Sequence, residues 1–160
     1  MRRNAMRTIA VVGPRGAGKT LIATSLAIYL HLATAKTVLI DHSPDRKGAW
    51  LARGYVKAAA DLAEARAAEA EYAVVDALPY EVPDADRYVL VVEPRHKPPQ
   101  FKDVLVVVNK AGRRPFAKNV IPFDDSVHWA MSAGYPPIAV RNVKSWRRLR
   151  DVVKWIAESL

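Results

Sequence analysis

The fold of this 160-residue chain follows from one stretch, Thr8-Ile9-Ala10-Val11-Val12-Gly13-Pro14-Arg15-Gly16-Ala17-Gly18-Lys19-Thr20. An apolar run comes first, the spacing G-x-x-x-x-G-K-[ST] follows it, and a helical pattern continues from Leu21 to Leu32. Glycines let backbone N–H groups curl around a phosphate, and the helix that begins there adds its positive end. The order strand, loop, helix therefore predicts that the chain binds a nucleoside triphosphate through a phosphate-binding loop (P-loop).

Individual positions of this loop have predicted roles. Lys19 is expected to reach the β- and γ-phosphates, and the Thr20 hydroxyl to bind Mg²⁺. Further nucleotide contacts are expected from the rest of the loop and the helix start: Gly13, Arg15, Gly16, Ala17, Gly18 and Leu21. Arg15 has two interpretations, a phosphate contact or a solvated surface charge, and the sequence alone leaves both open.

Length and composition restrict the class of protein. The length suits one domain over residues 1–160, with residues 1–6 as a flexible N-terminal segment. No apolar run approaches the ~20 residues that span a bilayer, and the first apolar stretch is a strand rather than part of a signal peptide. Because cysteine is absent, disulfides, thiolate metal sites and cysteine nucleophiles are excluded. A cytoplasmic protein is expected.

Short apolar runs along the chain predict an α/β fold. Strands are predicted at Thr8–Val12, Thr37–Asp41, Tyr72–Asp76, Tyr88–Val92, Val104–Val108 and Asn119–Pro122. Helices are predicted at Leu21–Leu32, Ala58–Tyr72, Asp125–Ser132 and Val143–Leu160. Nearly continuous apolar strands favour a mostly parallel sheet of about six strands with helices on both faces. Ligands bind such sheets at the carboxyl ends of the strands.

Two aspartates end predicted strands at that edge. Asp76 closes an apolar strand, as the Mg²⁺-side (Walker B) aspartate of P-loop enzymes does, although a helix-cap or turn aspartate is the other interpretation. Asp41, taken by itself, indicates a functional site less specifically than Asp76 does. Asp76 is therefore a predicted Mg²⁺ ligand, partly through water, and Lys19, Asp41 and Asp76 are the predicted catalytic residues.

With these motifs in order, the chain resembles the ParA/MinD partition-type ATPases, as a short and divergent member. Besides the P-loop, the likeness lies in four segments: the switch I-like Val38-Leu39-Ile40-Asp41-His42-Ser43-Pro44, the Walker B-like Tyr72-Ala73-Val74-Val75-Asp76, the strand Val106-Val107-Val108-Asn109-Lys110, and the late stretch Val120-Ile121-Pro122-Phe123-Asp124. The resemblance implies ATP or ADP with Mg²⁺ as ligands, Asn109 and Pro122 beside the adenine, and a nucleotide-dependent homodimer.

Three departures from the family pattern affect the expected mechanism. The family's lysine that reaches across a dimer to the partner's nucleotide falls on Pro14. The aspartate that orients the attacking water falls on Ser43, and because serine cannot accept a proton as a carboxylate does, weak hydrolysis is expected. The connections that follow the strands ending at Asp76 and Val92 are too short for the family's usual helices.

The formal net charge of +9 is compatible with an anionic partner, and equally with solubility or a general preference for arginine. The candidate DNA-contacting residues are Arg113, Arg114, Lys144, Arg147, Arg148 and Arg150. The last predicted helix is amphipathic, which suits packing on the sheet, DNA binding through its basic face, or binding to a membrane surface. Because packing and DNA binding use opposite faces, DNA is the favoured partner and a membrane is less favoured.

Three functions remain open from the sequence. The favoured one is an ATP- and Mg²⁺-binding switch with weak ATPase activity, acting in DNA partitioning or positioning. The first alternative is a small P-loop kinase with Arg113 and Arg114 in a phosphate-clamping loop, although no acceptor-binding insertion is evident. The second alternative is a non-catalytic nucleotide-binding module, which Pro14 and Ser43 favour.

Overall fold

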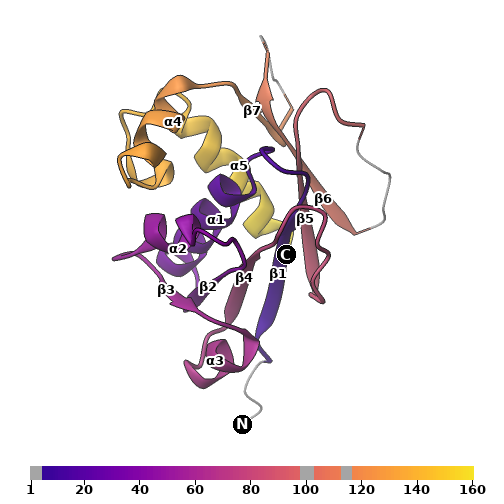
Figure 1. Ribbon diagram of the computed structural model, residues 1–160, viewed down its shortest axis with the longest axis vertical. Helices are drawn as coiled ribbons and strands as arrows, with labels where there is room; N and C mark the ends of the chain where they lie inside the picture. Colours follow the sequence, from indigo (N-terminus) through magenta and orange to yellow (C-terminus); the bar gives the residue numbers. More distant parts are fainter. Residues whose placement is uncertain (1–4, 98–102, 113–116) are drawn as a thin grey trace.

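The computed structural model describes residues 5–97, 103–112 and 117–160. Its strands are Arg7–Val12 (β1), Thr37–Asp41 (β2), Lys57–Ala59 (β3), Tyr72–Asp76 (β4), Arg87–Val92 (β5), Val104–Ala111 (β6) and Val120–Pro122 (β7). They form one parallel sheet in the order β3-β2-β4-β1-β5-β6-β7 (Figure 1). The connection from β1 leads toward β2, whereas that from the neighbouring β5 leads toward β6, so a topological switch point lies at their carboxyl ends.

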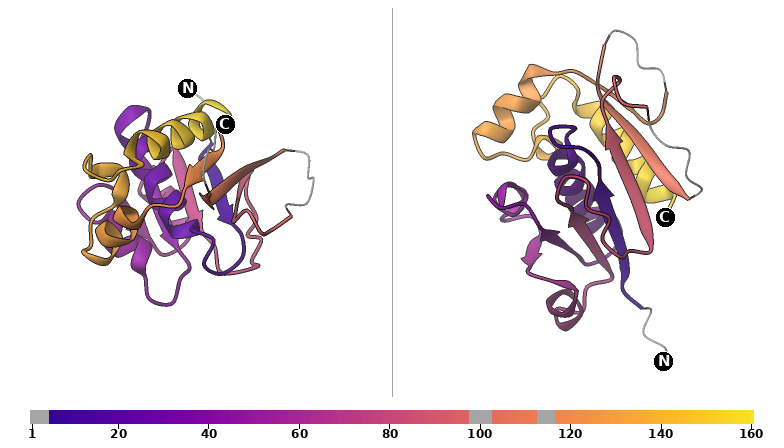
Figure 2. Two further views of the ribbon diagram at one scale, coloured as in Figure 1. Left: turned by 90° about the horizontal axis from the view of Figure 1, so that it is seen from above. Right: turned by 45° about the vertical axis from the view of Figure 1, so that its right-hand side comes forward.

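One face of the sheet carries a thick helical layer. The helices described on the two faces together are Lys19–Ala33 (α1), Lys47–Ala52 (α2), Leu62–Ala67 (α3), Asp125–Ser132 (α4) and Trp146–Glu158 (α5), with a 3₁₀ turn at Pro137–Ala139 (η1). Helices α1 and α5 pack side by side on this face, and Figure 2 shows them from two other directions. The core between these helices and the strands includes Ile9, Leu26, Val74 and Leu149, each 1% exposed or less.

The opposite face of the sheet is covered only in part. Over β2 and β4, Ala65 of α3 belongs to one apolar cluster with Val38 and Val75. Over β5, the side chains of Tyr88 and Leu90 remain half-buried. The connection between β4 and β5 is a loop over residues 77–86, as its length predicts.

The sequence prediction of an α/β fold with a parallel sheet is confirmed, and the elements near residue 60 are corrected. The sheet has seven strands rather than about six, because β3 pairs with β2 where a helix from Ala58 was expected. Helix α3 begins only at Leu62. The Asp61 side chain accepts a hydrogen bond from the Glu64 N–H (2.8 Å), and the Glu64 carboxylate accepts one from the Ala60 N–H (2.9 Å). This reciprocal cap fixes the helix start.

Helix α5 confirms the packed interpretation of the amphipathic C-terminal segment. Its apolar residues are buried beside α1: Leu149, Val152, Val153 and Ile156. The charged residues of the helix lie on its other side. Among the helices that the structure describes, none combines the length and the apolar character that crossing a bilayer requires.

One carboxylate joins α4 to α5. Asp124 caps α4, since its Oδ1 accepts hydrogen bonds from the backbone N–H (2.9 Å) and the hydroxyl of Ser126. Its Oδ2 accepts from the backbone N–H (2.7 Å) and the hydroxyl of Ser145, the residue before α5. Although burial opposes ionisation, these hydrogen bonds lower the pKa of Asp124. The ionised carboxylate is therefore a joint between the two helices.

Replacing Asp124 with alanine is expected to destabilise the fold by about 2–3 kcal/mol, because several charge-assisted hydrogen bonds are lost together. A lowered native pKa stabilises the fold above the unfolded-state value, so the difference from wild type should shrink as the pH falls through the pKa of Asp124. Urea unfolding at neutral and at acidic pH measures both effects. Asp125→Ala is the matched control, because Asp125 is exposed in the same helical turn. Equal losses in the two variants would contradict the role of Asp124.

Candidate functional site

The P-loop (residues 13–20) connects the carboxyl end of β1 to α1, and its path requires glycine at two positions. Gly13 has a φ of 150° and Gly18 a φ of 105°. An added Cβ would lie 2.2 Å from the Val91 carbonyl oxygen at Gly13, and 2.2 Å from Asn109 Nδ2 at Gly18. The loop is therefore pressed against the ends of β5 and β6, where a larger residue does not fit.

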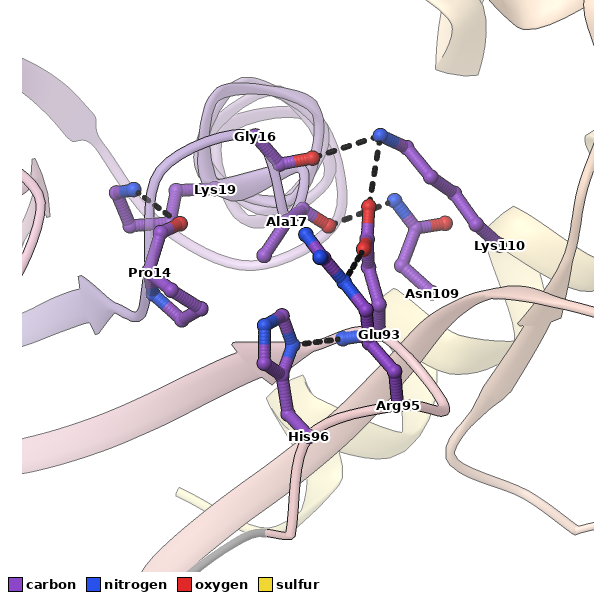
Figure 3. Close-up of polar contacts among 9 residues, drawn as sticks. All are labelled: Pro14, Gly16, Ala17, Lys19, Glu93, Arg95, His96, Asn109 and Lys110. Atoms are coloured by element: carbon purple, nitrogen blue, oxygen red, sulfur yellow. Dashed lines mark hydrogen bonds and ion pairs between the residues drawn. The ribbon is translucent and has the colours of Figure 1, made fainter.

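Lys19 lies inside the loop and is only 8% exposed. Its Nζ donates a hydrogen bond to the Pro14 carbonyl oxygen (3.0 Å; Figure 3). Burial lowers the pKa of Lys19, the charge of Asp76 opposes this effect, and the charge of Arg15 adds to it. Since Arg15 is exposed and repels Lys19, a bound anion near both side chains would relieve an unfavourable interaction.

Thr20, Asp41 and Asp76 meet at the carboxyl ends of β2 and β4. The Thr20 hydroxyl donates to Asp76 Oδ2 (2.8 Å), and Asp41 and Asp76 are register partners on the two strands. A Cβ added at Gly48 would lie 3.1 Å from Asp41 Oδ2 and 3.2 Å from Asp76 Oδ2, so the two carboxylates converge on one point. Burial raises the pKa of Asp76 to about 6; the Thr20 hydrogen bond opposes this rise, and Asp41 adds to it.

This cluster suits a hard divalent cation. Hydroxyl and carboxylate oxygens are ligands that Mg²⁺ prefers, and a cation would offset the repulsion between the two carboxylates. No cluster of three or more His, Cys, Asp or Glu side chains with metal-binding geometry occurs in the described ranges. A Mg²⁺ ion here would therefore be held by Thr20 and Asp76 together with phosphate and water oxygens.

Asp41 is fixed by the segment that follows it. The Ser43 backbone N–H (2.9 Å) and hydroxyl both donate to Asp41 Oδ1, and the Ala49 N–H donates to Oδ2 (2.9 Å). The Ser43 hydroxyl therefore orients a carboxylate of the cluster instead of facing a reacting water.

A cavity of about 550 Å³ extends from the P-loop to the opposite wall formed by β6, β7 and α4. Among the residues on that wall are Asn109, Lys110, Pro122, Phe123, His128 and Met131. Phe123 is 64% exposed, and it presents an aromatic face that sequence analysis did not single out. The cavity therefore joins the P-loop to a wall with an aromatic side chain, a shape that could take an elongated ligand with a polar and an aromatic end.

Two side chains of β6, Asn109 and Lys110, contact the P-loop (Figure 3). Asn109 is 4% exposed, and its Nδ2 donates to the Ala17 carbonyl oxygen (3.0 Å). Lys110 Nζ donates to the Gly16 carbonyl oxygen (2.7 Å) and pairs with Glu93 Oε1 (3.1 Å). The amide of Asn109 thus braces the loop, while the residue also lines the cavity beside Pro122.

Glu93, directly after β5, positions the Lys110 ammonium. The hydrogen bond from Lys110 lowers the pKa of Glu93, burial opposes that effect, and Arg95, which donates to Glu93 Oε2 (2.8 Å), adds to it. The Glu93 backbone N–H donates to His96 Nδ1 (3.0 Å), which holds the turn (Figure 3). Neither Glu93 nor the bracing role of Lys110 was predicted from the sequence. Their signal was a position close to the ends of predicted apolar strands, with Glu93 directly after Val92 and Lys110 two residues after Val108.

The Lys110→Met variant keeps the side-chain length and removes the ammonium. We expect it to weaken nucleotide binding about 3- to 10-fold, because the Gly16 carbonyl loses the hydrogen bond that helps to order the loop. Calorimetric titration with Mg·ADP measures the change. Lys118→Met serves as control, since Lys118 is exposed and does not contact the P-loop. An unchanged affinity in Lys110→Met would exclude the bracing role.

Two candidate DNA-contacting residues are engaged within the protein. Arg148 donates from Nε to the Val120 carbonyl oxygen (2.7 Å) and from its guanidinium to the Ala117 carbonyl oxygen, which ties α5 to β7. The Arg150 guanidinium lies 5.9 Å from the ring centroid of Trp146. Arg148 therefore has a structural role, whatever else its charge contributes.

The remaining candidates differ in how well they are placed. Lys144 and Arg147 are exposed at the start of α5. Arg113 and Arg114 lie outside the described residues. The exposed basic surface of α5 and the residues just before it therefore consists mainly of Lys144, Arg147, Arg150 and Lys154, the last 3.9 Å from Glu158.

No protein-family model and no curated protein sequence matches this chain. Solved structures with a similar fold include the MinD cell division protein of Aquifex aeolicus, with a TM-score of 0.72, 13% identity and coverage of 95% of this chain and 97% of that chain. They also include the septum site-determining protein MinD of Pyrococcus horikoshii, solved in complex with Mg-ADP, with a TM-score of 0.66, 13% identity and coverage of 94% and 96%. At this identity the likeness establishes a shared fold.

Proposed function

We propose that this chain is a Mg²⁺-dependent, ATP-binding P-loop NTPase that acts in the cytoplasm as a nucleotide-dependent switch and hydrolyses ATP slowly. The observation that carries the proposal is that Lys19 and Thr20 line one end of the cavity, where Thr20 is hydrogen-bonded to Asp76 and Asp41 lies beside Asp76. The Mg-ADP bound to the Pyrococcus protein of similar fold supports the same ligand class.

Each residue has a distinct task in this proposal. Mg²⁺, when bound, neutralises charge on the phosphates and orients them. Lys19 exchanges its hydrogen bond with the Pro14 carbonyl for the β- and γ-phosphates, and Thr20 and Asp76 hold the metal and its water shell. Asp41 lies next to that shell, and Asn109 with Pro122 lines the base end of the cavity.

Slow hydrolysis follows from the surroundings of Asp41. Its carboxylate oxygens already accept three hydrogen bonds from Ser43 and Ala49, and the Ser43 hydroxyl is engaged with them, so neither group is free to orient an attacking water. Product analysis with Mg·ATP tests the proposal directly. Slow release of free phosphate supports an ATPase, phosphate found on an added acceptor indicates a kinase, and tight binding without turnover indicates a binding module. If neither Mg·ATP nor Mg·ADP binds, the proposal is wrong.

We also propose that ATP promotes a homodimer across the cavity face. Phe123 and Trp129 support this proposal, because they are 64% and 74% exposed on and beside the cavity wall, where a second copy would bury them. Light scattering with a nonhydrolysable ATP analogue tests it. A mass that stays monomeric with the analogue bound would contradict it.

Non-specific DNA binding is the proposed output, supported by the net charge of +9 and the exposed basic side of α5. Replacing Lys144 and Arg147 together with glutamate should weaken duplex binding to all sequences equally. Wild-type affinity should fall steeply with salt, with a log–log slope of about −0.9 for each phosphate neutralised. Fluorescence anisotropy at several salt concentrations, with and without ATP, measures both.

The matched control for this DNA experiment is the double variant Lys36→Glu and Lys57→Glu. It makes the same change in net charge at exposed sites remote from α5. An equal loss in both double variants would assign the binding to overall charge, and no binding at low salt would reject DNA as a partner. Binding to anionic liposomes instead would indicate a membrane surface.

A further inference from the structure

The first turn of α2 is attached to the carboxylate cluster of the site. Gly48 packs so closely against Asp41 and Asp76 that a Cβ would lie 3.1 and 3.2 Å from their carboxylate oxygens. The next residue, Ala49, donates its N–H to Asp41 Oδ2 (2.9 Å). The backbone immediately before Gly48 is therefore held beside the carboxylates, and that position is occupied by Lys47.

Lys47 faces the site from this position. It is half-buried and lines the same cavity as Lys19 and Thr20. Its backbone N–H bonds to Asp45 Oδ1 (3.2 Å), which secures the turn. Within the part of the chain that the structure describes, the Lys47 ammonium forms no hydrogen bond or ion pair. A positive charge is thus held at the edge of the phosphate end without a protein partner.

The position of Lys47 separates it from the other phosphate-binding groups. Lys19 and Thr20 belong to the P-loop and its helix, which hold the phosphate chain from the β1 side. Lys47 comes from the β2 side, and the residue after it, Gly48, packs against the two carboxylates on which the metal site is built. Lys47 therefore enters the cavity from the side of the metal site, where the terminal phosphate would lie in the proposed function.

We propose that Lys47 binds the γ-phosphate from within the same chain and so makes the site distinguish ATP from ADP. The inference rests on the proposed nucleotide-binding function and assigns this chain its own cation at the terminal phosphate. Because α2 is joined to Asp41, the contact also couples the terminal phosphate to the segment between β2 and β3. Discrimination between the two nucleotides then needs no second copy of the chain.

The test is a calorimetric comparison of wild type and Lys47→Met, titrated separately with Mg·ADP and with a nonhydrolysable Mg·ATP analogue. Loss of one charge-assisted hydrogen bond should weaken binding of the analogue about 10-fold or more and leave the affinity for Mg·ADP nearly unchanged. Lys47→Arg should restore most of the preference. Lys57→Met is the matched control, since Lys57 is exposed on the edge strand β3 and does not line the cavity.

Two further results separate this inference from simpler explanations. At a protein concentration at which light scattering shows a monomer with the analogue bound, wild type should still prefer the analogue over ADP, because the proposed cation comes from the same chain. An equal loss for both nucleotides in Lys47→Met, or no loss for either, overturns the role of Lys47 while leaving nucleotide binding intact. If wild type binds neither nucleotide, the proposed function itself fails.

Discussion

Alanine in place of Lys19 is expected to weaken Mg·ATP binding by about 1.5–3 kcal/mol, roughly 10- to 150-fold, because a charge-assisted contact to the phosphates is lost. Lys19 is buried, and among the described residues its ammonium donates a hydrogen bond to the Pro14 carbonyl oxygen and to no carboxylate, so its charge is available to a ligand. Isothermal titration of both proteins with Mg·ATP and Mg·ADP measures the difference.

A loss of affinity in Lys19→Ala is not expected to come from a less stable fold. Burial lowers the pKa of Lys19, which means that the folded state disfavours its charge and that truncation removes an unfavourable interaction. The variant should therefore unfold at a denaturant concentration no lower than wild type. Lys36→Ala is a suitable control, since Lys36 is exposed before β2, at the opposite edge of the sheet. Equal Mg·ATP affinity in Lys19→Ala and wild type would show that the P-loop does not bind the phosphates as proposed.

The parts of this fold that the sequence predicts correctly are those with strong local signals. The P-loop has fixed spacing, and strands such as β4 are continuous apolar runs whose burial on both faces leaves little choice of structure. The edge strand β3 has no such signal, because its residues Lys57-Ala58-Ala59 favour a helix and become a strand only by pairing with β2. The helix was predicted to begin at Ala58, and the structure shows that a reciprocal cap between Asp61 and Glu64 sets the later start.

In the candidate site too, residues in local motifs were predicted from the sequence, whereas contacts between distant segments were not. Lys19, Thr20 and Asp76 were predicted from motif position, and the structure brings them together. Contacts that cross from one strand end to another, such as that of Lys110 with the Gly16 carbonyl, depend on the sheet order and leave no pattern in the sequence. Short helix α2 was not predicted either, because its position depends on hydrogen bonding to Asp41.

A conservative change at Asp76 should separate stability from ligand binding. Burial raises the pKa of Asp76 to about 6, so the folded state holds the proton more tightly than the unfolded chain does. Its contribution to stability is therefore fully present at acidic pH and is lost as the pH rises through about 6. At about 1.4 kcal/mol for each pH unit between the two pKa values, the ionised Asp76 disfavours the nucleotide-free fold by on the order of 1–3 kcal/mol at pH 8.

Asp76→Asn removes this charge while its amide oxygen still accepts the Thr20 hydrogen bond. The nucleotide-free variant should therefore be more stable than wild type at pH 8 by on the order of 1–3 kcal/mol, and the difference should vanish near pH 4. Mg·ADP should raise the stability of wild type and have little effect on the variant, because a metal ligand is missing. Urea unfolding at the two pH values, with and without Mg·ADP, measures all of these quantities.

Asp84→Asn is the control, because it removes the charge of an exposed carboxylate, and its free energy of unfolding should match that of wild type under every condition. An Asp76→Asn variant less stable than wild type at pH 8 would show that Asp76 is not an unfavourable buried charge. An Asp76→Asn variant that Mg·ADP stabilises as strongly as wild type would show that Asp76 is not a metal ligand.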